Sequence, residues 1–160
     1  MNKTELLKQV IARLEDDLLQ AQQAALTAYE TATHEENIAE NKYDTLGLEA
    51  SYLATGQARR AAAIRQTLAN WKLLVLRAFD PLLGIQLGAL IELSDDEDRR
   101  QCLFLGPDGA AMKLQQDGQS IQVIGPQAPL GLTLVGKTVG DEVTLHVASG
   151  VQLLEILSVD

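Results

Sequence analysis

The sequence predicts an α+β protein in which a long antiparallel helical hairpin precedes a small, mostly antiparallel β domain. Residues 1–78 are rich in strong helix formers, contain no proline and carry apolar residues in a seven-residue repeat. After the breaks at Asp80-Pro81 and Gly84, this repeat gives way to short apolar runs separated by turn residues. We therefore assign residues 1–80 to a coiled-coil hairpin and residues 81–160 to a β domain.

The sizes of the apolar residues indicate how the two predicted helices pair. The first seam is Leu7, Ile11, Leu14, Leu18, Ala21, Ala25, Ala28 and Ala32, and the second is Ala50, Ala54, Gln57, Ala61, Ile64, Leu68, Trp71, Val75 and Ala78. Large residues come early in the first seam and late in the second. A fold-back near Asn41 therefore matches large with large and small with small, which favours a hairpin. A compact bundle and a coiled-coil dimer are the alternatives.

The predicted tip of the hairpin, residues 35–44, is acidic. Its carboxylates are Glu35, Glu36, Glu40 and Asp44, against the single basic residue Lys42. Grouped carboxylates suit Mg²⁺, which proteins usually hold with one or two carboxylates plus waters or substrate phosphates. This pattern favours a metal shared with a partner over a private one. A solvated acidic helix end is the alternative.

Charge and composition limit the function classes. The net charge is −9, and an acidic surface repels phosphates, which argues against sequence-specific DNA binding. The chain has one cysteine, Cys102, so a reducing compartment and a cytoplasmic location are expected. The most apolar stretch, residues 73–93, is interrupted by charged residues and Pro81, which argues against a membrane span.

Basic residues concentrate in the second predicted helix, in which Arg59, Arg60 and Arg65 stand close together. The simplest interpretation is a solvated helix face. The functional alternative is a contact with a protein partner or with RNA phosphates.

Six strands and one short helix are predicted in the second domain. The strands are Ile85–Leu93, Cys102–Leu105, Ala111–Leu114, Ser120–Ile124, Val143–Ala148 and Val151–Val159, and the helix is Pro129–Val135. The charged run 95–100 is interpreted as a solvated hairpin loop.

Several short stretches carry a family resemblance. They are Pro129-Leu130-Gly131-Leu132, Leu134-Val135-Gly136-Lys137, Val139-Gly140-Asp141-Glu142-Val143 and Glu155-Ile156-Leu157-Ser158-Val159, with Glu40-Asn41 and Tyr43 at the tip. Together they resemble the Gre transcript-cleavage factors of the GreA/GreB type. In that family a helical hairpin with an acidic tip is joined to an FKBP-like domain, and the resemblance covers nearly the whole chain.

The resemblance implies a protein that enters the secondary channel of bacterial RNA polymerase, with its β domain at the channel rim. The tip would help to hold a second Mg²⁺, shared with the polymerase, while the polymerase hydrolyses backtracked RNA. The chain would be an accessory factor rather than an enzyme, with no cofactor of its own. The implied partner-binding residues are Arg59, Arg60, Pro129, Leu130 and Asp141.

The tip departs from the family pattern. The residues taken to assist the polymerase are Glu36, Asn37, Glu40 and Asp44, with Glu36 and Glu40 as ligands of the shared Mg²⁺. Aligning Glu40-Asn41 with the family motif places Asn37 where the family has an aspartate, and aligning Tyr43 instead places Ala39 opposite its glutamate. An amide binds Mg²⁺ more weakly than a carboxylate. A divergent paralogue is therefore expected, and a non-cleaving channel-binding regulator is an alternative.

Two further alternatives come from other function classes. A prolyl isomerase would follow from the FKBP-like fold, but the active pocket of that fold is lined by aromatic residues, and this domain offers only Phe104 and the preceding Phe79. A coiled-coil interaction protein unrelated to polymerase is the other. Because the helical seam is satisfied within one chain, a monomer is expected.

Overall fold

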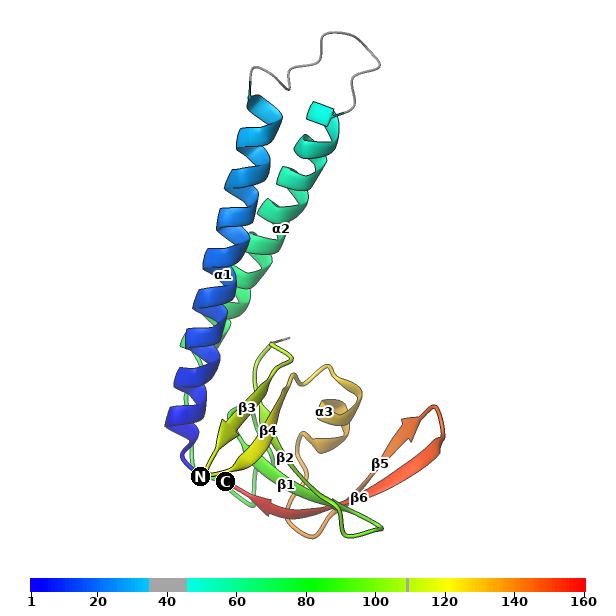
Figure 1. Ribbon diagram of the computed structural model, residues 1–160. Coiled ribbons are helices and arrows are strands. Elements are labelled where there is room, and N and C mark those ends of the chain that lie inside the picture. Colours follow the sequence, from blue (N-terminus) through cyan, green and yellow to red (C-terminus); the bar gives the residue numbers. More distant parts are fainter. Residues whose placement is uncertain (35–45, 109) are drawn as a thin grey trace. The chain divides into compact units, whose positions relative to one another are not determined.

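The computed structural model describes residues 1–34, 46–108 and 110–160, and it confirms the α+β class (Figure 1). Two long helices precede a six-stranded sheet with one short helix. The chain forms two compact units, one of residues 12–69 and one of residues 1–11 together with 70–160. The division at residue 80 follows chain order and stays a prediction.

The helical unit is built from α1 (Lys3–Thr33) and α2 (Leu46–Lys72), which run antiparallel side by side in Figure 1. Its buried residues are Leu14, Ala21, Ala28, Ala50, Ala61 and Leu68. All six belong to the predicted seams, so the hairpin prediction is confirmed between residues 14 and 68. Among the described residues, no helix is long and apolar enough to cross a membrane.

The predicted seams are wrong at the base of the hairpin. Helix α2 ends at Lys72, so Val75 and Ala78 lie outside it, and Val75 is 62% exposed. In α1 the fully buried residues are Leu6 and Val10, not the predicted Leu7 and Ile11. The reason is tertiary, because residues 1–11 and residues from 70 onward pack in the unit that contains the sheet.

The sheet has the strand order β3-β4-β2-β1-β6-β5. Its strands are β1 (Leu90–Asp95), β2 (Arg100–Leu105), β3 (Lys113–Gln116), β4 (Gln119–Ile124), β5 (Glu142–Val147) and β6 (Gly150–Val159), and α3 spans Pro129–Leu134. Every pairing is antiparallel except that of β2 with β4. All six predicted strands exist, but two are displaced. The first begins at Leu90 rather than Ile85, because residues 85–89 form turns around Gly88. The third spans Lys113–Gln116 rather than Ala111–Leu114.

Aliphatic side chains fill the core of this unit. Its fully buried members include Ile91, Leu93, Leu105, Leu154 and Ile156 from the strands, with Leu134 from α3 packed among them. Each side chain of this size contributes about 1.5–3 kcal/mol when it is removed from water. The core around α3 therefore depends on burial of branched side chains.

The ends of both long helices are fixed within the sheet-containing unit. The backbone N–H of Asn2 donates to Oε1 of Gln116 at 2.8 Å, and Nε2 of Gln9 donates to the carbonyl of Gln115 at 3.4 Å. At the end of α2, Trp71 is fully buried and its Nε1 donates to the carbonyl of Asp108 at 3.3 Å. The first turns of α1 are therefore held beside β3.

The charged loop between β1 and β2 is more ordered than the predicted solvated loop. Oδ1 of Asp95 accepts the backbone N–H groups of Glu97 and Arg99, each at 2.9 Å. Its Oδ2 accepts from Nε of Arg99 at 2.8 Å. The hydrogen bonds from Arg99 lower the pKa of the Asp95 carboxyl. Asp95 thus organises the loop as an ionised residue.

Candidate functional site

The acidic tip residues of the sequence analysis lie outside the described residues. Glu36, Asn37, Glu40 and Asp44 all fall in the segment 35–45, so their roles stay predictions. Within the part of the chain that the structure describes, no group of three or more His, Cys, Asp or Glu residues could hold a metal ion. The shared Mg²⁺ is likewise still a prediction.

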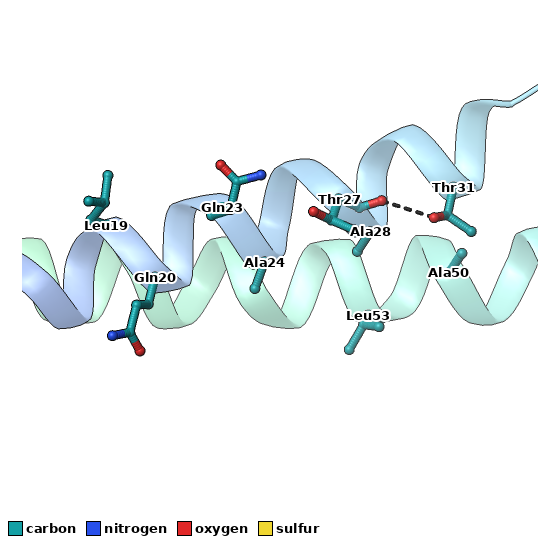
Figure 2. A pocket seen from close by; sticks show the side chains of 9 residues that line it. All are labelled: Leu19, Gln20, Gln23, Ala24, Thr27, Ala28, Thr31, Ala50 and Leu53. Carbon is teal, nitrogen blue, oxygen red and sulfur yellow. Dashed lines mark hydrogen bonds between the residues drawn. The ribbon is translucent and has the colours of Figure 1, made fainter.

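Small residues line the hairpin between its midpoint and the tip, and they leave a groove between the helices (Figure 2). The groove encloses about 760 Å³ and is lined by Leu19, Gln20, Gln23, Ala24, Thr27, Ala28 and Thr31 of α1 and by Ala50 and Leu53 of α2. Alanine side chains fill little volume, so neighbouring longer side chains form the walls. This part of the hairpin is a helix pair with a mostly apolar groove along one side.

The groove can accept an apolar side chain but offers few polar partners. The hydroxyl of Thr31 donates to the carbonyl of Thr27 at 3.0 Å, and this bond is drawn in Figure 2. The same helices expose Leu19 at 65%, Tyr29 at 60% and Tyr52 at 70%. These side chains lie outside the seam positions. Large apolar residues outside the seam are expected to be exposed, so the sequence could have identified them.

Gln57 is the polar residue that interrupts the second seam, and its side-chain oxygen lacks a hydrogen-bond donor. Its Oε1 is buried and has no hydrogen-bond partner among the described residues. A buried acceptor left without a donor costs about 1–3 kcal/mol. Gln57 therefore weakens the hairpin at a position where an apolar residue would fit the repeat.

The basic residues of α2 face solvent. Arg59, Arg60 and Arg65 are all exposed. Neither Arg59 nor Arg60 forms an ion pair with a residue that the structure describes. Exposed guanidinium groups without such an ion pair are available to an external carboxylate or phosphate.

The motif that carries the family resemblance is largely structural. Pro129 occupies the first turn of α3 and is exposed, whereas Leu130 packs against the core. The backbone of Gly131 lies so close to the carbonyl of Gly125 that a Cβ at this position would overlap it. Oδ2 of Asp141 accepts the N–H of Thr138 at 2.9 Å and closes the following turn.

The same motif also presents apolar side chains to solvent, which the sequence analysis did not single out. Leu132 is 61% exposed, Val139 48% and Val135 47%. Of the predicted contact residues in this motif, Pro129 is the most exposed, while Leu130 and Asp141 already have partners within the domain. The exposed apolar residues are therefore better placed to meet a partner protein.

The aromatic residues of the β domain do not form a substrate pocket. Phe104 is fully buried, with its ring centroid 5.8 Å from that of Trp71, and Phe79 packs against the core. Cys102 is half-buried in β2, and burial raises the pKa of its thiol. Such a thiol is a poor nucleophile.

Comparison with protein families gives one match. Residues 84–160 match the family described as transcription elongation factor, GreA/GreB, C-terminal. That range contains α3, the six strands of the sheet and the four C-terminal stretches that carry the resemblance, but not the tip residues. No curated protein sequence matches the chain.

Three solved structures illustrate the structural likeness. Gfh1 from Thermus aquaticus is 19% identical, with a TM-score of 0.42 and 92% of each chain covered. Another structure of the transcription factor Gfh1 is 23% identical, with a TM-score of 0.42, covering 93% of this chain and 92% of that one. The transcription elongation factor GreA/GreB from Nitrosomonas europaea is 20% identical, with a TM-score of 0.39, covering 62% of this chain and 78% of that one.

At these TM-scores the structural likeness adds no argument, so the assignment follows from the family match and covers the matched residues. Residues 84–160 therefore form a C-terminal domain of the GreA/GreB type.

Proposed function

We propose that this protein regulates transcription elongation by binding in the secondary channel of bacterial RNA polymerase. The observation that carries the proposal is a GreA/GreB-type C-terminal domain, residues 84–160, that follows an antiparallel helical hairpin in the same chain. The β domain would dock at the channel rim, and the hairpin would carry its acidic tip towards the active site. The polymerase would remain the catalyst and this chain its accessory factor.

Exposed groups on both parts of the chain suit this role. Arg59 and Arg60 would contact acidic polymerase side chains or phosphates of the extruded RNA. Leu132 and Val139 would join Pro129 in the contact at the rim. Apolar side chains suit the centre of an interface between proteins, so Leu132 and Val139 would serve the contact at the rim, and the arginines would serve a separate contact.

The chemistry of the tip would decide whether cleavage is stimulated. Glu40 and Glu36 would share a Mg²⁺ with the polymerase, which would activate a water and stabilise the leaving oxygen. If Glu40-Asn41 aligns with the family motif, Asn37 stands where the family has an aspartate, and its amide adds no charge to such a site. A non-cleaving regulator that occupies the channel is therefore the second candidate.

The test is RNA cleavage by purified polymerase in stalled, backtracked elongation complexes. A cleaving factor would shorten the RNA faster, and Glu40→Ala would abolish the effect. Asn37→Asp restores the family carboxylate and would raise the cleavage rate if the amide limits Mg²⁺ binding. Glu30→Ala, which removes a carboxylate from α1 outside the tip, is the matched control and would leave the rate unchanged.

A binding measurement separates the two candidates. A protein that does not accelerate cleavage, but displaces a cleavage-active Gre factor from polymerase, would be the non-cleaving regulator. Arg59→Ala with Arg60→Ala would weaken that displacement. Absence of both cleavage and displacement, with folding verified by circular dichroism, would reject the polymerase proposal.

A further inference from the structure

The two edge strands of the sheet, β3 and β5, differ in what lies beside them. Strand β3 carries Lys113, and the first turns of α1 reach it through the hydrogen bonds of Asn2 and Gln9. Strand β5 is the other edge, and no strand lies on its outer side in the part of the chain that the structure describes. Its sequence contains no lysine, arginine or proline, which are the residues that commonly prevent an edge strand from pairing.

The backbone of β5 presents regularly spaced donors and acceptors at this edge. The N–H of Ile156 donates to the carbonyl of Asp141 at 2.9 Å, which fixes the phase of the ladder between β5 and β6. In an antiparallel pair, alternate residues direct their backbone groups to the partner strand. The N–H and C=O groups of Glu142, Thr144 and His146 therefore point towards the open edge.

Because only Glu142, Thr144 and His146 direct their backbone groups outward, one register is favoured between two copies of the strand. A second β5 that runs antiparallel can engage all three outward-facing residues only when Thr144 pairs with Thr144. The same register sets Glu142 opposite His146 of the second copy, and by symmetry this happens twice. It also sets half-buried Leu145 opposite Val143 of the second copy, which is an apolar pair.

The charges on β5 also favour a second copy of this strand as the partner at the open edge. Within one chain Glu142 lies directly opposite Glu155 of β6, and both side chains are exposed. Like charges placed opposite each other destabilise a sheet. A second copy would supply the imidazole of His146 beside Glu142, which a strand with an acidic or purely apolar face would not do.

We propose that two copies of this chain associate through antiparallel pairing of their β5 strands, centred on Thr144. The contact is short and has no large apolar centre, so we expect a dissociation constant of about 0.1–1 mM. The expectation of a monomer rested on the helical seam, which this edge does not involve. The association does not depend on polymerase binding.

Charge substitutions test the register by sedimentation velocity of the full chain over a concentration series. Glu142→Lys and His146→Glu each remove or reverse both cross-strand pairs, and each should weaken self-association by roughly tenfold. An equimolar mixture of the two variants should associate at least as tightly as the original chain, because both pairs in the mixed dimer then carry groups of opposite character. A mixture that associates no better than the separate variants would overturn the register.

Thr144→Pro tests the backbone contact. It removes an N–H that points to the open edge and leaves the β5–β6 ladder intact, so folding should persist while self-association is lost. Thr144→Lys serves the same purpose if the proline variant does not fold. Association that survives both variants, as a helix-mediated dimer would, overturns the proposal.

A cross-linking measurement checks the centre of the pairing. Residues in a hydrogen-bonded antiparallel pair have Cα atoms about 5.5 Å apart, within disulfide range. In a Cys102→Ser background, Thr144→Cys should therefore oxidise to a covalent dimer at least about tenfold faster than the exposed turn control Ser149→Cys. Equal rates for the two variants would overturn the proposal.

Discussion

The indole ring of Trp71 lies directly against the backbone of Gly106, so close that a Cβ on Gly106 would overlap ring atoms. The ring is fully buried and tilted by 52° against Phe104. Gly106 follows β2 and donates its N–H to the carbonyl of Ile124 at 2.9 Å, which limits how far it can move. This contact fixes the last turn of α2 against the sheet within one compact unit.

Gly106→Ala should destabilise the protein, because either the indole or the hydrogen-bonded backbone must move. We expect a loss of about 1–3 kcal/mol in the free energy of unfolding, typical of overpacking. Denaturant unfolding measures it. The matched control is Gly56→Ala in α2, where an added Cβ meets nothing within 4 Å. That change should instead stabilise the helix by about 0.5–1 kcal/mol, and equal effects of the two would contradict the packing account.

Gln57→Leu should stabilise the hairpin. The substitution removes a buried acceptor without a partner and restores the apolar repeat. We expect a gain of about 1 kcal/mol and a rise in Tm of about 3 °C. Gln22→Leu, on an exposed position of α1, is the control and should change Tm little. A lower Tm for Gln57→Leu would mean that its amide has a role in the hairpin.

Ala21→Leu should separate the helices. Ala21 is 3% exposed on the seam and does not line the groove, so a larger side chain has no space and must push α2 away. A destabilisation of about 1–3 kcal/mol is expected. Ala24→Leu points into the groove of Figure 2 and should be tolerated. Thermal unfolding of both variants distinguishes the filled seam from the open groove.

Acid should loosen the loop between β1 and β2. The pKa of Asp95 is lowered in the folded chain, chiefly by the hydrogen bond from Arg99, relative to an ordinary value of 3.8. A depressed pKa means that the ionised carboxylate stabilises the fold fully above that value, and that this contribution is lost as the pH falls through the folded pKa. Hydrogen exchange of the Glu97 and Arg99 amides should therefore accelerate in Asp95→Asn at neutral pH.

The neighbouring Asp96→Asn is the control for that experiment, since Asp96 is exposed beside the same loop. It should leave the exchange of both amides unchanged. The unfolding free energy of Asp95→Asn should also depend less on pH below about 4 than that of the original chain. Identical acid profiles would show that Asp95 does not hold the loop.

The sequence by itself determined the fold class, the hairpin between Leu14 and Leu68, and the existence of every strand. It could do so because these features depend on local periodicity, turn residues and matched side-chain size. The motif around Gly131 was likewise recognisable, and it is present because backbone atoms approach too closely for a Cβ.

Only the tertiary structure decided where the buried residues of the two helices depart from the seven-residue repeat. Leu6 and Val10 are buried, and α2 ends at Lys72, because these segments pack in the unit of the sheet, where contacts with residues distant in sequence determine which face is buried. The open edge of β5 also depends on strand order, which pairs β5 with β6 alone among the described strands. A periodic pattern contains no information about strand order, so the repeat could not have located this edge.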